Sequence, residues 1–277
     1  MTIRRSLAWV LLYVAAWAAA SGSVDAADLH ADTVTAFDRY VRLTEARLDE
    51  ERRGTLPFLW IETLGNTQRQ NADTALRRGE VIVGRLETRD AGRPIDIPGG
   101  QYHYWIGTIF VPGVTLDRIA ALMQAYDRYH EIYRPSVRQS RVLARDGDRF
   151  TVSLQLFTKK VISVVLNTDY DVRYLRLAPT RMHVRSVTTR IAEVQRPDTA
   201  DERERPVGHD NGFLWRFNNY CALEERGSGT YVQCESVSLS RTIPTGLGWL
   251  IGPFVTSIPK ESLEFTLRAM RGALATR

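Results

Sequence analysis

Apolar residues recur every three or four positions in three parts of the chain and every second position in most of the rest. The three parts with helical spacing are residues 29–53, residues 115–133 and the segment that follows Pro259. In the last of these, the apolar stripe consists of Leu263, Leu267, Met270 and Leu274. Each segment therefore predicts an amphipathic helix with one buried face.

Strand-like patterning fills the space between these helices. Residues 80–89 and 101–113 are rich in β-branched and aromatic side chains and predict two strands. Residues 137–195 predict a long run of further strands, with a turn at Asp146-Gly147. After a polar loop, the stretches GFLWRFNNYCALEE and TYVQCESVSLSRTI predict two more.

The predicted order is strands, a helix, a meander of antiparallel strands and a final long helix. Because strand–helix–strand alternation is missing from this order, a doubly wound parallel sheet is disfavoured. We predict an α+β fold in which the final helix covers an antiparallel sheet. The expected parts are a signal peptide at 1–26, an N-terminal helical extension at 27–79 and the main domain at 80–277. Within the extension, residues 55–79 have no pattern clear enough to assign.

The first 26 residues are organised like a secretory signal peptide. Arg4 and Arg5 form a positive start, residues 7–20 are apolar, and Val24-Asp25-Ala26 suits cleavage after Ala26. The alternative is an uncleaved membrane anchor. It is disfavoured because the apolar run is shorter than the ~20 residues that a membrane span needs. We therefore expect an exported protein of a bacterial periplasm.

Composition and charge indicate a globular protein without a nucleic-acid partner. Hydrophobic residues make up 44% of the chain and charged residues 25%, which is typical of a globular protein. Removal of residues 1–26 leaves 35 basic and 31 acidic residues, a net charge of +4. Because the charges are scattered, they predict a solvated surface and no nucleic-acid partner.

Linear motifs for metal, nucleophile or cofactor chemistry are missing from the sequence. His130-Glu131 is not followed by a second histidine four positions after the first, which disfavours zinc. Gly227-Ser228-Gly229 lacks the spacing of a nucleophile elbow, and GLGWLIG misses the dinucleotide-binding pattern. We expect no metal and no cofactor.

The C-terminal two thirds of the chain resemble a known superfamily. The stretches GFLWRFNNYCALEERGSGTYVQCESVSLSRTI and GWLIGPFVTSIPKESLEFTLRAMRGAL are similar to exported bacterial members of the START and polyketide-cyclase-like superfamily. The resemblance covers residues 100–275. It implies a helix-grip fold, in which a curved antiparallel sheet wraps a long C-terminal helix. It also implies a hydrophobic or amphipathic small molecule bound between the two. Because the superfamily includes both lipid carriers and cyclases, the resemblance leaves the activity open.

Alternation along the last two strands separates two faces. One face carries Arg216, Asn218, Tyr220, Glu235 and Arg241, and the other carries the cysteines and a run of serines. Because serines suit solvent, we predict that the charged face lines the cavity. There, an arginine would hold an acidic or hydroxylated ligand head group. The alternative is a structural Arg–Glu pair.

Two further residues are candidates for the ligand site. His103 lies among aromatic residues on the strand predicted at 101–113. Trp249 belongs to TGLGWLIGPFV, a segment expected to gate the cavity or to contact a membrane transiently. For Trp249, plain burial under the sheet is the alternative.

Cys221 and Cys234 are the two cysteines of the chain. A two-residue turn at Gly227-Ser228 places them directly opposite each other. Their Cα atoms would then lie roughly 4.5–5.5 Å apart, within the range of a disulfide. Since export provides an oxidising compartment, we predict a bridge. A bulge at Gly229 is the alternative and would leave two thiols.

Two functions follow from these patterns. The first is a binding protein or carrier for a hydrophobic or amphipathic, lipid-like molecule. The second is an enzyme of the cyclase, aromatase or hydrolase kind, with dispersed residues such as Tyr220 and Glu235. We favour the carrier because the sequence contains no recognisable catalytic set.

Overall fold

A single large antiparallel sheet organises the chain in a computed structural model that describes residues 27–160, 163–242 and 248–275. The side chains of residues 248–256 lie outside the described part. The sheet order is β2-β5-β13-β12-β9-β8-β7-β6, and the short β10 pairs with β9. In sheet order the bounds are Ile82–Arg85, Gly100–Pro112, Gly229–Arg241, Arg216–Arg226, Arg181–Gln195, Ser163–Ala178, Arg149–Lys159 and Val137–Asp146, with β10 at Arg203–Glu204.

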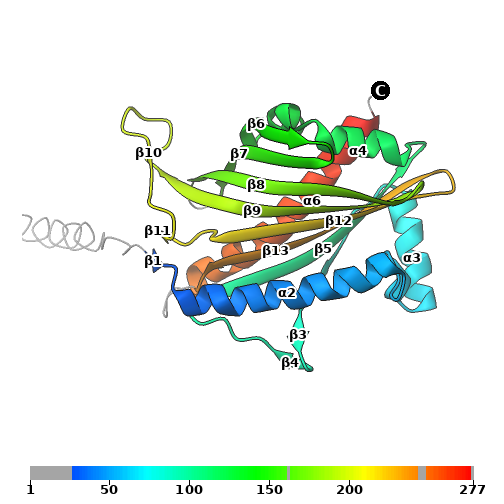
Figure 1. Cartoon of the computed structure of the whole chain (residues 1–277), viewed down its shortest axis with the longest axis horizontal. Coiled ribbons are helices and arrows are strands. Elements are labelled where there is room, and N and C mark those ends of the chain that lie inside the picture. Colours follow the sequence, from blue (N-terminus) through cyan, green and yellow to red (C-terminus); the bar gives the residue numbers. More distant parts are fainter. Residues whose placement is uncertain (1–26, 161–162, 243–247, 276–277) are drawn as a thin grey trace, which may run out of the picture.

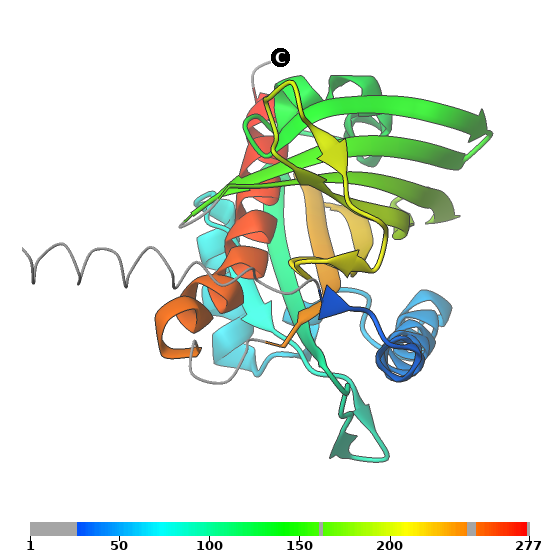
Figure 2. The ribbon, with the colours of Figure 1, turned by 90° about the vertical axis from the view of Figure 1, so that its left-hand side faces the viewer.

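Helices cover both faces of this sheet. The long helix α6 (Gly248–Ala275) lies on the face that we call the inner face, and α2 (Ala31–Arg53) lies on the opposite, outer face (Figures 1 and 2). The smaller helices are η1 (Trp60–Thr63), α3 (Asn66–Arg77), α4 (Leu116–Gln124), η2 (Tyr126–Arg128) and α5 (Tyr129–Ile132). Two small ladders complete the fold: β1 (Ala27–Asp28) with β11 (His209–Asp210), and β3 (Arg89–Asp90) with β4 (Arg93–Pro94).

The inner core fixes α6 against the centre of the sheet. Leu263, Leu267, Met270 and Leu274 are all buried there, as the apolar stripe predicts. The approach is close at Gly107 of β5, where an added Cβ would lie 2.6 Å from the Leu267 side chain. The predicted α+β helix-grip architecture is therefore confirmed by the arrangement of the strands and of α6.

The outer core has two parts. Phe37, Tyr40 and Leu48 of α2 pack against residues of β5, β12 and β13. Beside them, η1 and α3 pack Leu59, Ile61 and Leu76 on the neighbouring part of the same face. The outer face of the central strands is thus buried as fully as the inner one.

Two predicted helices differ from the structure in their bounds. The segment 115–133 begins as predicted, with the Thr115 hydroxyl accepting from the Arg118 amide, but it breaks into α4, η2 and α5. At the break, the Met123 carbonyl accepts from the hydroxyls of Tyr129 (2.6 Å) and Tyr174 (2.9 Å). These side chains satisfy a carbonyl that a continuous helix would pair with a backbone amide.

The C-terminal helix begins at Gly248, eleven residues before Pro259. Pro259 lacks an amide hydrogen, yet the helix runs through it. Residues 55–79, which the sequence left unassigned, contain η1 and α3.

The edges of the sheet are short or irregular. β2 pairs with only four residues of the much longer β5. At the other edge, the β6–β7 ladder has register shifts between Val137 and Gln139 and between Val142 and Ala144.

Candidate functional site

The side chains on the inner face of the sheet change from apolar to polar along the central strands. Beneath the C-terminal half of α6 this face is apolar, with Ile109, Leu223 and Val232 buried against the helix. Towards the other end of β13, the same face carries Ser236, Ser238 and Ser240. These three serines are buried rather than solvated, so the prediction that the serine face is exposed was wrong.

Uncharged polar groups from three neighbouring strands gather around these serines. The register places His103 beside Ser238, and Asn219 beside Ser236. His103 Nε2 lies 3.2 Å from the Ser240 hydroxyl. We call His103, Asn219, Ser236, Ser238 and Ser240 the polar strip.

The imidazole of His103 is neutral in this setting. Burial, reinforced by the charge of Arg85, lowers the pKa of His103 to about 4. The polar strip therefore offers hydrogen bonds without any formal charge.

Apolar side chains around the strip are only partly buried. Trp105 and Phe217 flank it on β5 and β12, and Leu154 and Leu156 lie further across the sheet on β7. From α6, Phe265 is also half-buried. Half-buried apolar groups that face a helix provide surface that a small apolar molecule can cover.

Two surface grooves of about 640 Å³ each lie elsewhere on the molecule. One separates α2 from the β3–β4 arm and has arginine and aspartate side chains along it. The other runs between α4 and the last turns of α6, and its lining includes Leu122, Ile132 and Ala269. These three residues also pack against the inner core, so the second groove continues its apolar surface outward.

The predicted charged face points away from α6. Tyr220 packs in the outer core with α2, and Asn218 and Glu235 are buried on that same face. By the register of β12 and β13, Arg216 and Arg241 also belong to it. The prediction that this face lines the gap beneath α6 was wrong. Alternation shows which residues share a face, but here a helix covers each face.

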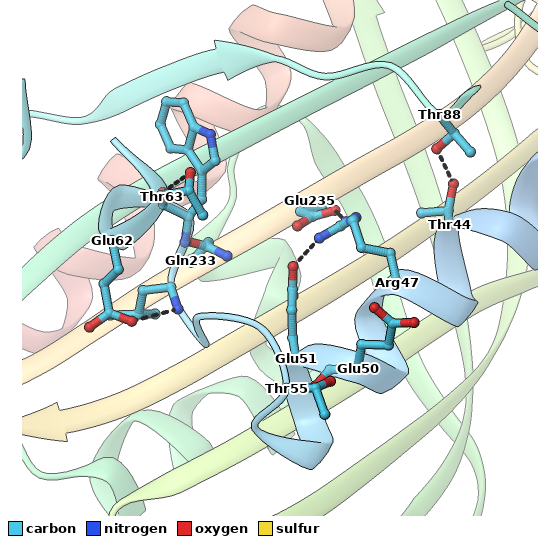
Figure 3. A network of polar contacts seen from close by, with 12 residues as sticks. Thr44, Arg47, Glu50, Glu51, Thr55, Glu62, Thr63, Thr88, Gln233 and Glu235 are labelled. Carbon is cyan, nitrogen blue, oxygen red and sulfur yellow. Dashed lines mark hydrogen bonds and ion pairs between the residues drawn. The ribbon is translucent and has the colours of Figure 1, made fainter. Parts of the chain in front are cut away.

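Between α2 and the sheet, charged side chains form a layer that Figure 3 shows in part. Arg47 of α2 reaches Glu235 of β13 at 2.5 Å, as Figure 3 shows. Arg47 also donates to the hydroxyl of Tyr104 at 2.6 Å. Its other terminal nitrogen contacts Glu51, and the Tyr104 hydroxyl also donates to Glu235. The predicted Arg–Glu pair thus exists, but its arginine comes from α2 rather than from the sheet.

Burial dominates the protonation of this layer. The pKa of Glu51 is raised to about 7 by burial, opposed by Arg47 and reinforced by Glu235. The pKa of Tyr104 is raised well above its usual value by burial and by the charge of Glu235. Two carboxylates around one guanidinium leave an excess negative charge in a poorly solvated place, and a proton on Glu51 relieves it.

A second set of polar contacts extends the layer towards β9. Glu45 of α2 accepts from the hydroxyl of Tyr220 and from Arg185 Nε, both at 2.8 Å. Asn218 donates to the same Tyr220 hydroxyl at 3.1 Å. Tyr220 therefore anchors α2, and the pKa of its hydroxyl is raised by burial and by Glu45.

Neutral contacts complete the attachment of the N-terminal helices. The Thr44 and Thr88 hydroxyls lie 2.6 Å apart (Figure 3). The Trp60 amide donates to Gln233 Oε1 at 2.6 Å. The sequence pattern did not predict this interface. The one sequence feature that pointed to it was the set of polar residues on β13, including Gln233 and Glu235, that alternation places on a single face.

Three remaining candidates lie in different places. Arg216 donates to the carbonyl of its neighbour Trp215 at 2.8 Å, and the Arg241 amide donates to the Gly212 carbonyl at 2.7 Å. Trp249 falls within α6, but its side chain is outside the described residues.

The predicted disulfide between Cys221 and Cys234 is confirmed. The two Cα atoms lie 4.1 Å apart, and Cys221 pairs with Cys234 across β12 and β13. Gly227 has a φ of +65°, and Arg226 pairs directly with Gly229, so the hairpin has the two-residue turn and lacks the alternative bulge. The bridge lies on the inner face, within the core beneath α6.

Two kinds of feature are missing from the described residues. Within residues 27–160, 163–242 and 248–275, no group of three or more histidine, cysteine or acidic residues is placed to hold a metal. Across the same ranges, no helix is long and apolar enough to cross a membrane.

Comparison with known proteins gives distant structural similarity. No family model and no curated protein matches the sequence. Among solved structures, a STAR-related lipid transfer protein fragment from Xanthomonas axonopodis is 16% identical, with a TM-score of 0.45. That match covers 70% of this chain and 99% of the other.

Two further structures show the range of the likeness. A START superfamily protein from Mycobacterium smegmatis is 14% identical, with a TM-score of 0.42, covering 62% of this chain and 96% of that one. The Zhui aromatase/cyclase from a Streptomyces species is 11% identical, with a TM-score of 0.40, covering 62% and 93%. Because these TM-scores are below 0.5, the helix-grip assignment rests on the strand order and helix placement of this chain itself.

Proposed function

We propose that this chain is an exported, periplasmic protein that binds a hydrophobic or amphipathic small molecule between α6 and the inner face of the sheet. The polar end of the molecule would meet the polar strip, and its apolar part would lie along the half-buried side chains beside it. The protein would act as a carrier rather than as an enzyme.

The observation that carries this proposal is the amphipathic floor of the inner face. A single strand, β13, presents Val232 to the inner core and Ser238 and Ser240 further along the same face. Serine hydroxyls can hydrogen-bond the polar end of an amphipathic ligand, and the neighbouring apolar residues can cover the rest of it. An ordinary core would favour apolar residues at these positions.

Further support comes from the side chains around the strip. Trp105 and Phe217 border it and are half-buried, which suits contact with an apolar chain or ring. The groove between α4 and α6 adds apolar surface continuous with the same core. An entry route along α6 is consistent with both observations.

The enzyme alternative loses its named residues. Tyr220 and Glu235 were its candidates, and both are buried beneath α2 on the outer face. They are already engaged with Glu45 and Arg47. A ligand beneath α6 would therefore meet neutral hydrogen-bonding groups in place of this pair.

The periplasmic part of the proposal rests on the N-terminal sequence. Export with cleavage after Ala26 would leave a chain that begins at Ala27. The Cys221–Cys234 bridge supports export because disulfides persist in oxidising compartments. N-terminal sequencing of the protein from a periplasmic extract tests this, and a mature chain that retains residues 1–26 would contradict it.

Ligand binding is tested on protein purified from its own host. Native mass spectrometry before and after organic extraction should reveal a bound small molecule, and the ligand-free protein should take up the neutral apolar probe N-phenyl-1-naphthylamine. Ser238→Leu should reduce probe uptake by filling the floor, while Ser238→Ala tests the hydroxyl without added bulk. Ser153→Leu is the matched control, because its side chain lies on the outer face of β7.

The outcome that overturns the proposal is specific. Absence of any extractable molecule, together with equal probe uptake by Ser238→Leu, Ser153→Leu and the parent protein, would rule out a site on the inner face. A folded Ser238→Leu variant, checked by its thermal transition, is required for that comparison.

A further inference from the structure

Three arginines and one histidine gather on the outer face beside the last turn of α2. Arg185 and His183 are two positions apart on β9 and share that face. Arg173 lies directly opposite Arg185 on β8, and Arg52 comes from the last turn of α2. We call these four residues the cationic corner.

Two like charges of this corner face each other across neighbouring strands. Arg173 and Arg185 are direct cross-strand partners, an arrangement that destabilises a sheet. Arg185 donates to Glu45, but Arg173 approaches Asp171 only at 3.7 Å, beyond hydrogen-bonding distance. The other oxygen of Asp171 is held by Arg149.

Arg52 adds a third positive charge. It contacts Asp49 on its own helix. Its pKa is nevertheless lowered, first by burial, which the attraction of Glu45 opposes and repulsion from Arg185 and Arg53 reinforces. Arg52 follows Glu45, the partner of Arg185, by two turns of α2, so both residues lie on the same side of the helix.

His183 contributes a buried nitrogen without a partner. The residue is 4% exposed, and its Nε2 makes no hydrogen bond with any described group. Burial lowers the pKa of His183 to about 3, and repulsion from Arg52, Arg185 and Arg47 adds to this shift. A buried polar atom left unpaired is costly to the folded state.

We propose that the cationic corner binds a small oxyanion of the phosphate class through Arg52, Arg173, Arg185 and His183. One such ligand would relieve both sources of instability, since its charge offsets the arginines and its oxygens accept from their guanidinium groups. In the tautomer protonated at Nε2, neutral His183 donates to a further oxygen.

The corner is accessible to such a ligand. The side chains of Arg52, Arg173 and Arg185 are 25%, 56% and 35% exposed. All three arginines therefore reach solvent, whereas His183 on the same face of the sheet is buried. The neighbouring layer of Arg47, Glu51 and Glu235 is internally paired.

Opposing charges limit the affinity. Glu45 and Asp49 are near the arginines, and the C-terminal end of α2 adds partial negative charge. We therefore expect weak binding that falls with ionic strength. This site is independent of the inner face, so either proposal can fail alone.

The test uses inorganic phosphate and the full mature chain. Isothermal titration calorimetry, with sodium chloride matched for ionic strength, measures phosphate affinity for the parent protein, Arg173→Gln and Arg42→Gln. Arg173 makes only the 3.7 Å contact with Asp171, so its replacement disturbs little. Arg42 is an exposed arginine elsewhere on α2 and provides the matched charge control. Loss of a charged hydrogen bond should weaken binding roughly tenfold in Arg173→Gln and leave Arg42→Gln unchanged.

A second measurement reports on His183 directly. Proton NMR titration of the imidazole should show its pKa rising when phosphate is present, because a bound anion favours the imidazolium form. Neutral and phosphatidylglycerol-containing vesicles then separate the two sources of phosphate. If the protein sediments with the anionic vesicles and Arg173→Gln does not, the ligand is a lipid head group. If the protein binds only free phosphate, the ligand is a soluble molecule. No phosphate binding, or equal loss in Arg173→Gln and Arg42→Gln, overturns the proposal.

Discussion

Glu51 of α2 and Glu235 of β13 share the guanidinium of one residue, Arg47. The two carboxylates are more than 180 positions apart in the sequence, so their meeting ties the N-terminal helix to the centre of the sheet. Arg47 is half-buried and Glu235 is 2% exposed. This arrangement makes the attachment of α2 sensitive to protonation.

Glu51→Gln should change the pH dependence of stability. The pKa of Glu51 is about 7 in the folded protein and 4.5 in a model compound, so the folded state binds the proton more tightly. Stability from this group is present below pH 4.5 and is lost as pH rises through 7. We therefore compare the free energy of unfolding of Glu51→Gln with that of the parent. The difference, variant minus parent, should be larger at pH 8 than at pH 5 by on the order of 2 kcal/mol.

Urea unfolding of both proteins at the two pH values checks this prediction. The comparison between variant and parent removes the contribution of other titrating groups, including His183. An equal difference at pH 5 and pH 8 would show that Glu51 is ionised throughout this range.

Arg47→Met should be strongly destabilising. It leaves Glu235 buried on the outer face with the Tyr104 hydroxyl but without a cation. Breaking a buried ion pair from one side costs roughly 3–5 kcal/mol. The matched control is Arg39→Met, because Arg39 pairs with Asp90 on the surface and such pairs contribute about 0–1 kcal/mol. Similar losses in urea unfolding would contradict a buried role for Arg47.

Reduction of the disulfide should weaken the protein without abolishing the hairpin. The bridge closes a loop with a sequence separation of 13, which corresponds to roughly 2–3 kcal/mol in the chain-entropy description. Cys221 and Cys234 would remain buried against α6 and would keep their apolar contacts. Denaturant unfolding with and without reductant measures the difference, and the Cys221→Ser/Cys234→Ser double variant should lose stability and cease to respond to reductant.

Gly107 and Gly272 should respond in opposite ways to alanine. A Cβ at Gly107 would meet Leu267 at 2.6 Å and Leu263 at 3.2 Å, so Gly107→Ala should displace α6 and cost about 1–3 kcal/mol. Gly272 lies in α6 with nothing within 4 Å of an added Cβ, so Gly272→Ala should stabilise the helix by about 0.5–1 kcal/mol. Thermal unfolding of the pair tests the placement of α6, which would be wrong if Gly107→Ala were neutral.

The sequence was informative wherever the determining pattern was local. The hairpin turn at Gly227-Ser228 set the register of two strands and so predicted the partner of Cys221. The stripe from Leu263 to Leu274 predicted the buried face of α6. In both cases the relevant residues are close in the chain.

The site was less predictable because it depends on which helix covers which face. Alternation grouped Tyr220 with Glu235, but only the position of α2 shows that they are buried away from α6. Their partners Glu45 and Arg47 lie in a helix whose own pattern indicates an ordinary amphipathic surface. The surroundings of His183 were equally hidden, since Arg47 and Arg52 come from α2, which is distant in the sequence.

The irregular edges of the sheet have a consequence for self-association. An exposed strand edge is a template for strands from other molecules, and bulges and charged side chains discourage such pairing. β6 carries both, with two register shifts and with Arg138, Arg141 and Arg145 along its length. At the opposite edge, β2 offers only four residues to a neighbour. Both edges of this large sheet therefore discourage strand pairing with a second copy of the chain.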